Sequence, residues 1–132
     1  MQWTEDLAVG VEAIDSQHKE LFRRINGLVD AIGQGKCKSV IDSVITFLED
    51  YAVVHFSAEE SSMVKNAYPE YDQHRKQHSL YLANLSDLKK ELAEDGPSYV
   101  LSVTTNQVVV DWIISHILQT DMKFGEYLKK IS

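Results

Sequence analysis

Five histidines are the residues of this chain whose type and spacing most favour chemistry. His55 and Glu59 are four residues apart, as are His74 and His78, so each pair shares one face of a helix. A single core histidine is usually a hydrogen-bonded packing residue, but several buried imidazoles without partners would be costly. A shared metal ion removes that cost, because each ring gives it one nitrogen. The five are His18, His55, His74, His78 and His116.

Two carboxylates accompany these histidines. Glu59 stands on an apolar stripe, where a carboxylate is rare unless it is paired or metal-bound. Glu60 lies one residue further round the helix, where we expect it to be solvated or to support a ligand. Asp121 follows His116 by five residues, which is about 140° on an ideal helix. Asp121 can therefore join His116 only if the helix ends or unwinds between them.

The number of ligands indicates the kind of metal site. Five histidines and two carboxylates are too many for one tetrahedral zinc ion, and they suit two six-coordinate ions bridged by both carboxylates and an oxo or hydroxo group. Imidazole and carboxylate without thiolate favour iron. Three histidines would complete one ion and two would leave its neighbour with an open position, where dioxygen would bind.

Four long segments must position these residues. Glycine and proline are concentrated at Gly33–Gly35, Tyr68-Pro69 and Gly96-Pro97, and the segments between them carry apolar residues at helical spacing. The β-branched residues near Val108 favour a strand locally, but the length of that segment and its apolar spacing favour a helix. We predict an all-α, up-down-up-down four-helix bundle. Its parts are one domain (1–132) with an N-terminal arm (1–14), helices at approximately 16–33, 39–65, 70–94 and 98–119, and a short C-terminal helix at 122–130.

Composition excludes several classes of function. The net charge of −7 argues against a nucleic-acid partner, and no apolar run is long enough for membrane insertion. The acidic N-terminus lacks the features of a signal peptide, so we expect a cytoplasmic protein. The one cysteine, Cys37, has no partner for an internal disulfide.

Taken together, the motifs resemble those of the hemerythrin family, and in particular single-domain bacteriohemerythrins. The resemblance spans nearly the whole chain. It rests on Trp3 with Val9-Gly10-Val11, Ile14-Asp15-Ser16-Gln17-His18, His55-Phe56-Ser57-Ala58-Glu59-Glu60, Tyr68-Pro69 with His74 and His78, and Trp112 through His116-Ile117 to Asp121.

The resemblance implies a particular division of the ligands between two iron ions, without heme. His74, His78 and His116 would hold the iron that has no open position. His18 and His55 would hold the iron with the open site, and Glu59 and Asp121 would bridge the two. Around the oxygen pocket we expect Trp112, and less strongly Ile113, Phe22 and Phe56. Core packing is an equally good interpretation for Trp112 and the better one for Phe22 and Phe56.

The function that the resemblance implies is reversible dioxygen binding for storage, delivery or scavenging, with no enzymatic turnover. An oxygen or redox sensor acting in trans is an alternative, because the bundle fills the chain and leaves no output domain. A diiron enzyme acting on peroxide or nitric oxide is another. Enzymes of that bundle type usually use several glutamates with Glu-x-x-His pairs, whereas this chain is rich in histidine. The sequence does not identify a protein partner.

Overall fold

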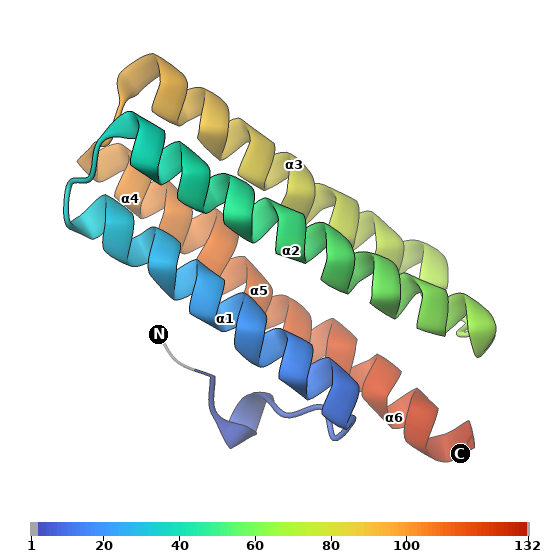
Figure 1. The fold of residues 1–132 in the computed structure, drawn as a ribbon. Coiled ribbons are helices and arrows are strands. Elements are labelled where there is room, and N and C mark those ends of the chain that lie inside the picture. The colour runs from blue at the N-terminus through green and yellow to red at the C-terminus, as the bar shows by residue number, and fades with distance from the viewer. Residues whose placement is uncertain (1–2, 132) are drawn as a thin grey trace.

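The computed structural model describes residues 3–131, and residues 1, 2 and 132 lie outside the described part. Four helical rods run antiparallel to their neighbours, so the all-α four-helix bundle predicted from the sequence is confirmed (Figure 1). The fourth rod is built from several consecutive helical segments. The elements are η1 (Glu5–Leu7), α1 (Glu12–Gly33), α2 (Lys38–Lys65), α3 (Tyr71–Asp95), α4 (Tyr99–Thr105), η2 (Asn106–Asp111), α5 (Trp112–His116), η3 (Ile117–Asp121) and α6 (Met122–Ile131).

Each long helix buries one stripe of side chains three or four residues apart, which is the repeat of an α-helix. This repeat, rather than intrinsic helix propensity, explains why the segments form and pack as a bundle. In α1 the stripe begins with a histidine and continues with apolar residues. Its buried members include His18, Leu21, Phe22, Ile25, Leu28 and Ile32.

The fourth rod differs from the expected helix at 98–119 and separate helix at 122–130. The backbone stays helical from Tyr99 to Ile131 without an intervening turn. Ser98 caps the start, where its Oγ accepts a hydrogen bond from the backbone N–H of Leu101 at 3.0 Å. The β-branched run remains helical because Val109 is fully buried in the core, so tertiary packing outweighs the local preference for a strand.

Two segments of this rod, η2 and η3, are wound as π-helix. A π-helix has a wider turn with i→i+5 hydrogen bonds, so it brings residues five apart towards the same face. In η3 this winding brings Asp121 back over His116, and Asp121 Oδ1 lies 3.0 Å from His116 Nε2. The helix therefore does not end at this point. It unwinds locally into a wider turn, which is one of the two conditions that the α-helical period set.

The N-terminal arm lies along the bundle and joins α1 at Glu12, so the first helix begins four residues before the expected residue 16. Residues 1 and 2 of the predicted arm lie outside the described residues. Asp15 is inside the helix, and its Oδ1 accepts a hydrogen bond from the N–H of Val9 at 2.8 Å. Gly125 of α6 allows the close approach of the arm, because a Cβ there would lie 2.7 Å from Val9 O.

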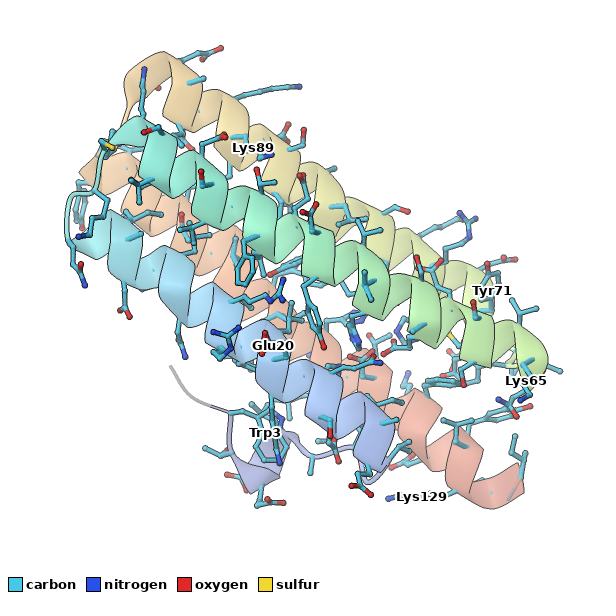
Figure 2. The ribbon with its side chains drawn as sticks, viewed as in Figure 1. Trp3, Glu20, Lys65, Tyr71, Lys89 and Lys129 are labelled. Carbon is cyan, nitrogen blue, oxygen red and sulfur yellow. The ribbon has the colours of Figure 1, made fainter. Side chains whose placement is uncertain are left out.

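Trp3 packs the N-terminal arm against the outer side of α1. Figure 2 shows Trp3 beneath the first half of this helix, and Lys19 Nζ lies 4.5 Å from the centre of its ring. This cation–π contact agrees with the packing of Trp3 against the core. Among residues 3–131, no helix is both long and apolar enough to cross a membrane.

One end of the bundle has an apolar core. It is the end where α1 finishes, α2 begins, α3 finishes and α4 begins (Figure 1). The histidine positions lie towards the other end of the same helices. The buried residues of the apolar end include Leu28, Ile32, Ile41, Ile45, Leu85, Leu88, Leu92 and Leu101.

Candidate metal centre

The seven residues singled out by type and spacing converge inside the bundle. All of them are buried, and the most exposed keep only 3% of their surface. They come from all four rods, so the bundle itself assembles the site. The contributions are His18 from α1, His55 and Glu59 from α2, His74 and His78 from α3, His116 from α5 and Asp121 from η3.

The convergent side chains form two overlapping groups, each able to surround one metal ion. Within each group, one ligand atom per residue lies within 4.8 Å of all the others. Both groups contain Glu59 and Asp121, while no histidine is shared. One group adds His74, His78 and His116 to the carboxylates, and the other adds His18 and His55. The cluster is therefore unequal, with three imidazoles on one side and two on the other.

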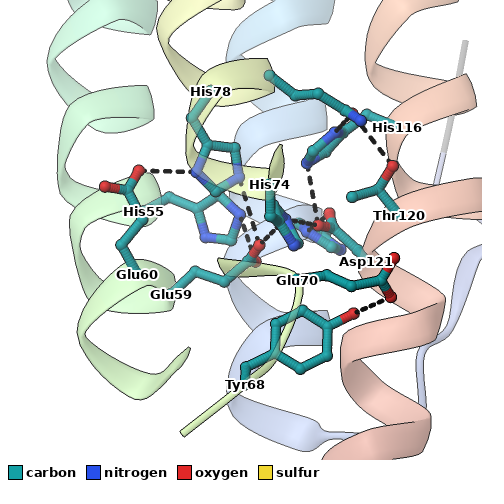
Figure 3. A network of polar contacts seen from close by, with 12 residues as sticks. His55, Glu59, Glu60, Tyr68, Glu70, His74, His78, His116, Thr120 and Asp121 are labelled. Carbon is teal, nitrogen blue, oxygen red and sulfur yellow. Dashed lines mark hydrogen bonds and ion pairs between the residues drawn. The ribbon is translucent and has the colours of Figure 1, made fainter. Parts of the chain in front are cut away.

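Glu59 divides its two oxygens between the groups. Its Oε1 lies 2.7 Å from His74 Nε2 and 3.4 Å from His78 Nε2, on the three-histidine side (Figure 3). Its Oε2 lies 3.4 Å from His55 Nε2, on the two-histidine side. A carboxylate placed in this way can give one oxygen to each of two ions.

Asp121 divides its oxygens in the same way. Oδ1 lies 2.8 Å from His74 Nε2 and 3.0 Å from His116 Nε2. Oδ2 lies 3.0 Å from His18 Nε2. All five imidazoles thus direct Nε2 towards the same two carboxylates.

Three of the imidazoles are also held from outside, through Nδ1. The acceptor in each case is an amide or carboxylate oxygen, so Nδ1 carries the hydrogen and Nε2 keeps its lone pair for a metal. Such outer hydrogen bonds fix the ring orientation of metal-binding histidines. The contacts are His55 Nδ1 to Gln17 Oε1 at 2.6 Å, His78 Nδ1 to Glu60 Oε2 at 2.8 Å, and His116 Nδ1 to Gln77 Oε1 at 2.7 Å.

Two of these acceptors, Gln17 and Gln77, were not predicted from the sequence, and the role of Glu60 was left open between two possibilities. Gln17 and Gln77 each directly precede a histidine of the cluster, and that adjacency was the available signal. Thr120 was also missed, and its hydroxyl donates to Gln77 Oε1 at 3.1 Å. For Glu60 we expected either solvation or support of a ligand, and its carboxylate supports the ring of His78 through the contact with Nδ1.

Several polar atoms in the cluster have contacts of ion-pair length but no hydrogen-bond partner. They include both oxygens of Glu59, Oδ2 of Asp121 and Nε2 of His18, His78 and His116. Buried polar atoms are normally satisfied, and these atoms all face the space shared by the two groups. Nitrogen and oxygen donors that converge in this way fit a pair of cations.

The electrostatics of the cluster favour cations as well. Burial lowers the pKa of His55 to about 4, which keeps this imidazole neutral. Burial also opposes the charging of His74, but close contacts with Asp121 and Glu59 outweigh it and raise the pKa of His74 to about 9. Burial raises the pKa of both carboxyls, but hydrogen bonds and charge interactions with the surrounding imidazoles outweigh burial. The pKa of Glu59 and that of Asp121 therefore lie below their ordinary values. Two buried carboxylates that stay ionised therefore favour the binding of a cation between them.

The aromatic residues expected near an oxygen pocket lie mainly against the three-histidine group. Trp112 stacks on His116, with ring centres 4.8 Å apart and an interplanar angle of 11°. Phe56 stacks on His78 at 4.0 Å and 4°, and its centre is 5.6 Å from that of the His55 ring. Phe22 and Ile113 are fully buried in the core. Whether any of these four lines an oxygen pocket stays a prediction.

Comparison with known proteins identifies the class to which this fold and site belong. Residues 9–128 match the family model described as the hemerythrin HHE cation binding domain. The chain is 33% identical to the bacteriohemerythrin of Methylococcus capsulatus, over 97% of this chain and 96% of that protein. It is 29% identical to the myohemerythrin of Theromyzon tessulatum, over 93% and 89% of the two chains.

A solved structure agrees with these sequence matches. The crystal structure of a wild-type hemerythrin superimposes with a TM-score of 0.84 at 33% identity, covering 97% of each chain. The chain belongs to the hemerythrin family, and it carries the family's cation-binding domain with a buried cluster of histidine, glutamate and aspartate.

Proposed function

We propose that the chain binds two iron ions in the buried cluster and binds dioxygen reversibly at one of them. His74, His78 and His116 would hold one ion, and His18 and His55 the other. Glu59 and Asp121 would bridge the two. No heme and no enzymatic turnover are part of this proposal.

The donor set supports iron. Imidazole nitrogen and carboxylate oxygen without thiolate suit iron among the redox metals. The divided oxygens of Glu59 and Asp121 support a bridged pair rather than two separate ions. A pair of ferrous ions bound there would supply the two electrons needed for the reversible binding of dioxygen.

The protein's own contribution is to keep the two positions unequal. On the three-histidine side, three imidazoles and two carboxylates would offer five protein donors to an ion. On the two-histidine side, two imidazoles and the same carboxylates would offer four, so one more position would stay free there. The burial of all seven residues keeps bulk water from that free position. The sharing of two carboxylates between one group of three histidines and one group of two is the observation that carries the proposal.

The relatives support the choice of dioxygen over other small molecules. Proteins named bacteriohemerythrin and myohemerythrin match nearly the full length of this chain. Storage, delivery and scavenging would all use the same site. A sensor acting in trans would use it too, and would be recognised by a partner that binds the deoxygenated and oxidised forms differently.

The test is an optical titration of the purified, iron-loaded chain. We expect two irons per chain, and a charge-transfer band that appears when the reduced protein meets dioxygen and disappears on deoxygenation over repeated cycles. Zinc-loaded protein, which has no redox chemistry, is the control and should show no band. An absent or irreversible band would contradict the proposal. Steady turnover of peroxide or nitric oxide well above the rate of autoxidation would favour a diiron enzyme instead.

A further inference from the structure

The outer partners of the three anchored imidazoles differ in charge. The Nδ1 atoms of His55 and His116 each contact the side-chain oxygen of a glutamine. The Nδ1 atom of His78 contacts a carboxylate oxygen of Glu60. The three contacts are of similar length, so the difference between them is one of charge. A hydrogen bond to a charged carboxylate makes the imidazole a better electron donor to a metal than one to a neutral amide does.

The His78 ring is held firmly between this carboxylate and the cluster. Glu60 Oε2 lies 2.8 Å from Nδ1, and the opposite nitrogen, Nε2, lies 3.4 Å from Glu59 Oε1 (Figure 3). Phe56 stacks on the ring face almost in parallel. Because hydrogen bond and stack restrict the ring from perpendicular directions, Nε2 has little freedom to turn from the metal position.

Glu60 also connects the buried cluster with the surface. Its side chain keeps 24% of its exposure, whereas His78 is buried. It lines a groove between α2 and α3 together with Ser57, Ser61, Val64, Lys65 and Tyr71. Figure 2 shows Lys65 and Tyr71 at this end of the two helices. The carboxylate can therefore keep part of its hydration while it acts on the buried ring, which limits the cost of its charge.

We propose that Glu60 is a positioning residue that makes the two metal positions electronically unequal. It orients His78 and adds negative charge behind one ligand of the three-histidine group. Negative charge favours the ferric over the ferrous state of a nearby ion. Among residues 3–131, no carboxylate makes such an outer hydrogen bond to the two-histidine group. His55 Nδ1 contacts the neutral Gln17, and His18 Nδ1 has no hydrogen-bond partner. This inference rests on the proposed diiron site, and it adds a role that the ligand set alone does not contain.

The test compares Glu60→Gln and Glu60→Ala in the full chain. Gln keeps an acceptor for Nδ1 without the charge, and Ala removes both. Gln17→Glu is the matched control, because it places a carboxylate behind His55 on the two-histidine side. Helicity and the free energy of unfolding of every variant are measured first, so that a change in stability is not mistaken for an effect on the metal.

The first readout is metal affinity, measured by competition between cobalt-loaded protein and a chelator. We expect Glu60→Ala to weaken cobalt binding at one of the two positions by about 10- to 100-fold. Glu60→Gln should weaken it by less, because the orienting hydrogen bond remains. This measurement needs neither iron nor dioxygen.

The second readout is the midpoint potential of the iron-loaded protein, with an electrode supplying one electron per ferric ion reduced. We expect Glu60→Gln to raise the potential, by about 59 mV for a tenfold change in the one-electron equilibrium constant. Gln17→Glu should lower it. A purely structural role for Glu60 would leave the potential unchanged.

The outcomes separate this inference from the proposed function. If cobalt affinity and potential shift as expected but no reversible oxygen band forms, Glu60 keeps its role and the oxygen-binding proposal fails. If the band is normal while both Glu60 variants match the wild type in affinity and potential, the role of Glu60 is wrong. Variants that lose only stability would also overturn it.

Discussion

The two ends of the bundle are built from the same four rods in different ways. At the apolar end, buried aliphatic side chains such as Leu88 and Ile45 pack against one another. At the metal end, histidine and carboxylate side chains occupy the inward faces of the same helices, one or more helical turns further along. The helical period is the same at both ends, and only the chemistry of the inward residues changes.

The difference shows which end can be completed by the polypeptide alone. Apolar side chains need only contact with each other, and each one that is buried contributes to stability by leaving water. The metal end instead contains buried atoms without hydrogen-bond partners, among them both oxygens of Glu59. We therefore expect substitutions at the metal end to change metal content first, and substitutions at the apolar end to change stability first.

The largest effect should come from Glu59→Ala, because both metal groups contain Glu59. We expect the variant to lose nearly all of its iron, since the bridge between the two positions is gone. Glu49→Ala is the matched control on the same helix, because Glu49 forms a partly exposed ion pair with Lys89. Iron is measured per chain by elemental analysis. A Glu59→Ala protein that keeps as much iron as the control would show that Glu59 is not needed to hold the metal.

His55→Ala should lose about half as much iron as Glu59→Ala. His55 belongs to the two-histidine group alone, so we expect the variant to lose or weaken the iron of that group and with it the oxygen-dependent absorption. Circular dichroism should show a largely intact fold. Normal iron content with normal oxygen binding would contradict the assignment of His55 as a ligand.

Leu88→Ala should separate stability from metal content. Leu88 is 1% exposed at the apolar end, and truncating a buried leucine costs about 2–5 kcal/mol of unfolding free energy. Leu80→Ala on the same helix is the control, because Leu80 is 53% exposed. Both variants should keep wild-type iron after loading. Loss of iron in the folded Leu88→Ala protein would show that the two ends are not independent.

Tyr127→Phe should have the smallest effect. The Tyr127 hydroxyl donates to the carbonyl oxygen of Asn66 at 2.7 Å, which ties α6 to the connection before α3. Loss of this hydrogen bond should cost about 0.5–1.5 kcal/mol in chemical denaturation. Tyr99→Phe, at a tyrosine that is 83% exposed, should change little. Equal stabilities of the two variants would show that the hydrogen bond from Tyr127 to Asn66 does not contribute to the free energy of unfolding.

The fold and the convergence of six of the seven side chains were predictable because both follow from the helical period. The spacing of His74 and His78 places them on one face whatever the exact helix bounds. The relation of Asp121 to His116 was not predictable in this way, because it depends on the π-helical turn of η3. A rule based on 3.6 residues per turn requires the helix to end or unwind at that point, but it does not say which of the two happens.

The histidines that Gln17 and Gln77 contact could not be assigned from the sequence, although each glutamine directly precedes a histidine of the cluster. Gln17 and Gln77 are polar residues on helices, and such residues are usually solvated. Their roles depend on the rotation of each helix relative to its neighbour, since each bond joins side chains about 38 or 39 residues apart. The period of one helix contains no information on that rotation.

The most direct test of the central claim is a structure of the iron-loaded chain with anomalous scattering measured at the iron edge. We predict two iron peaks per chain, one bound by Nε2 of His74, His78 and His116 and the other by Nε2 of His18 and His55. Each of the carboxylates Glu59 and Asp121 should contact both peaks. A single peak, or two peaks with the histidines divided in another way, would contradict the account.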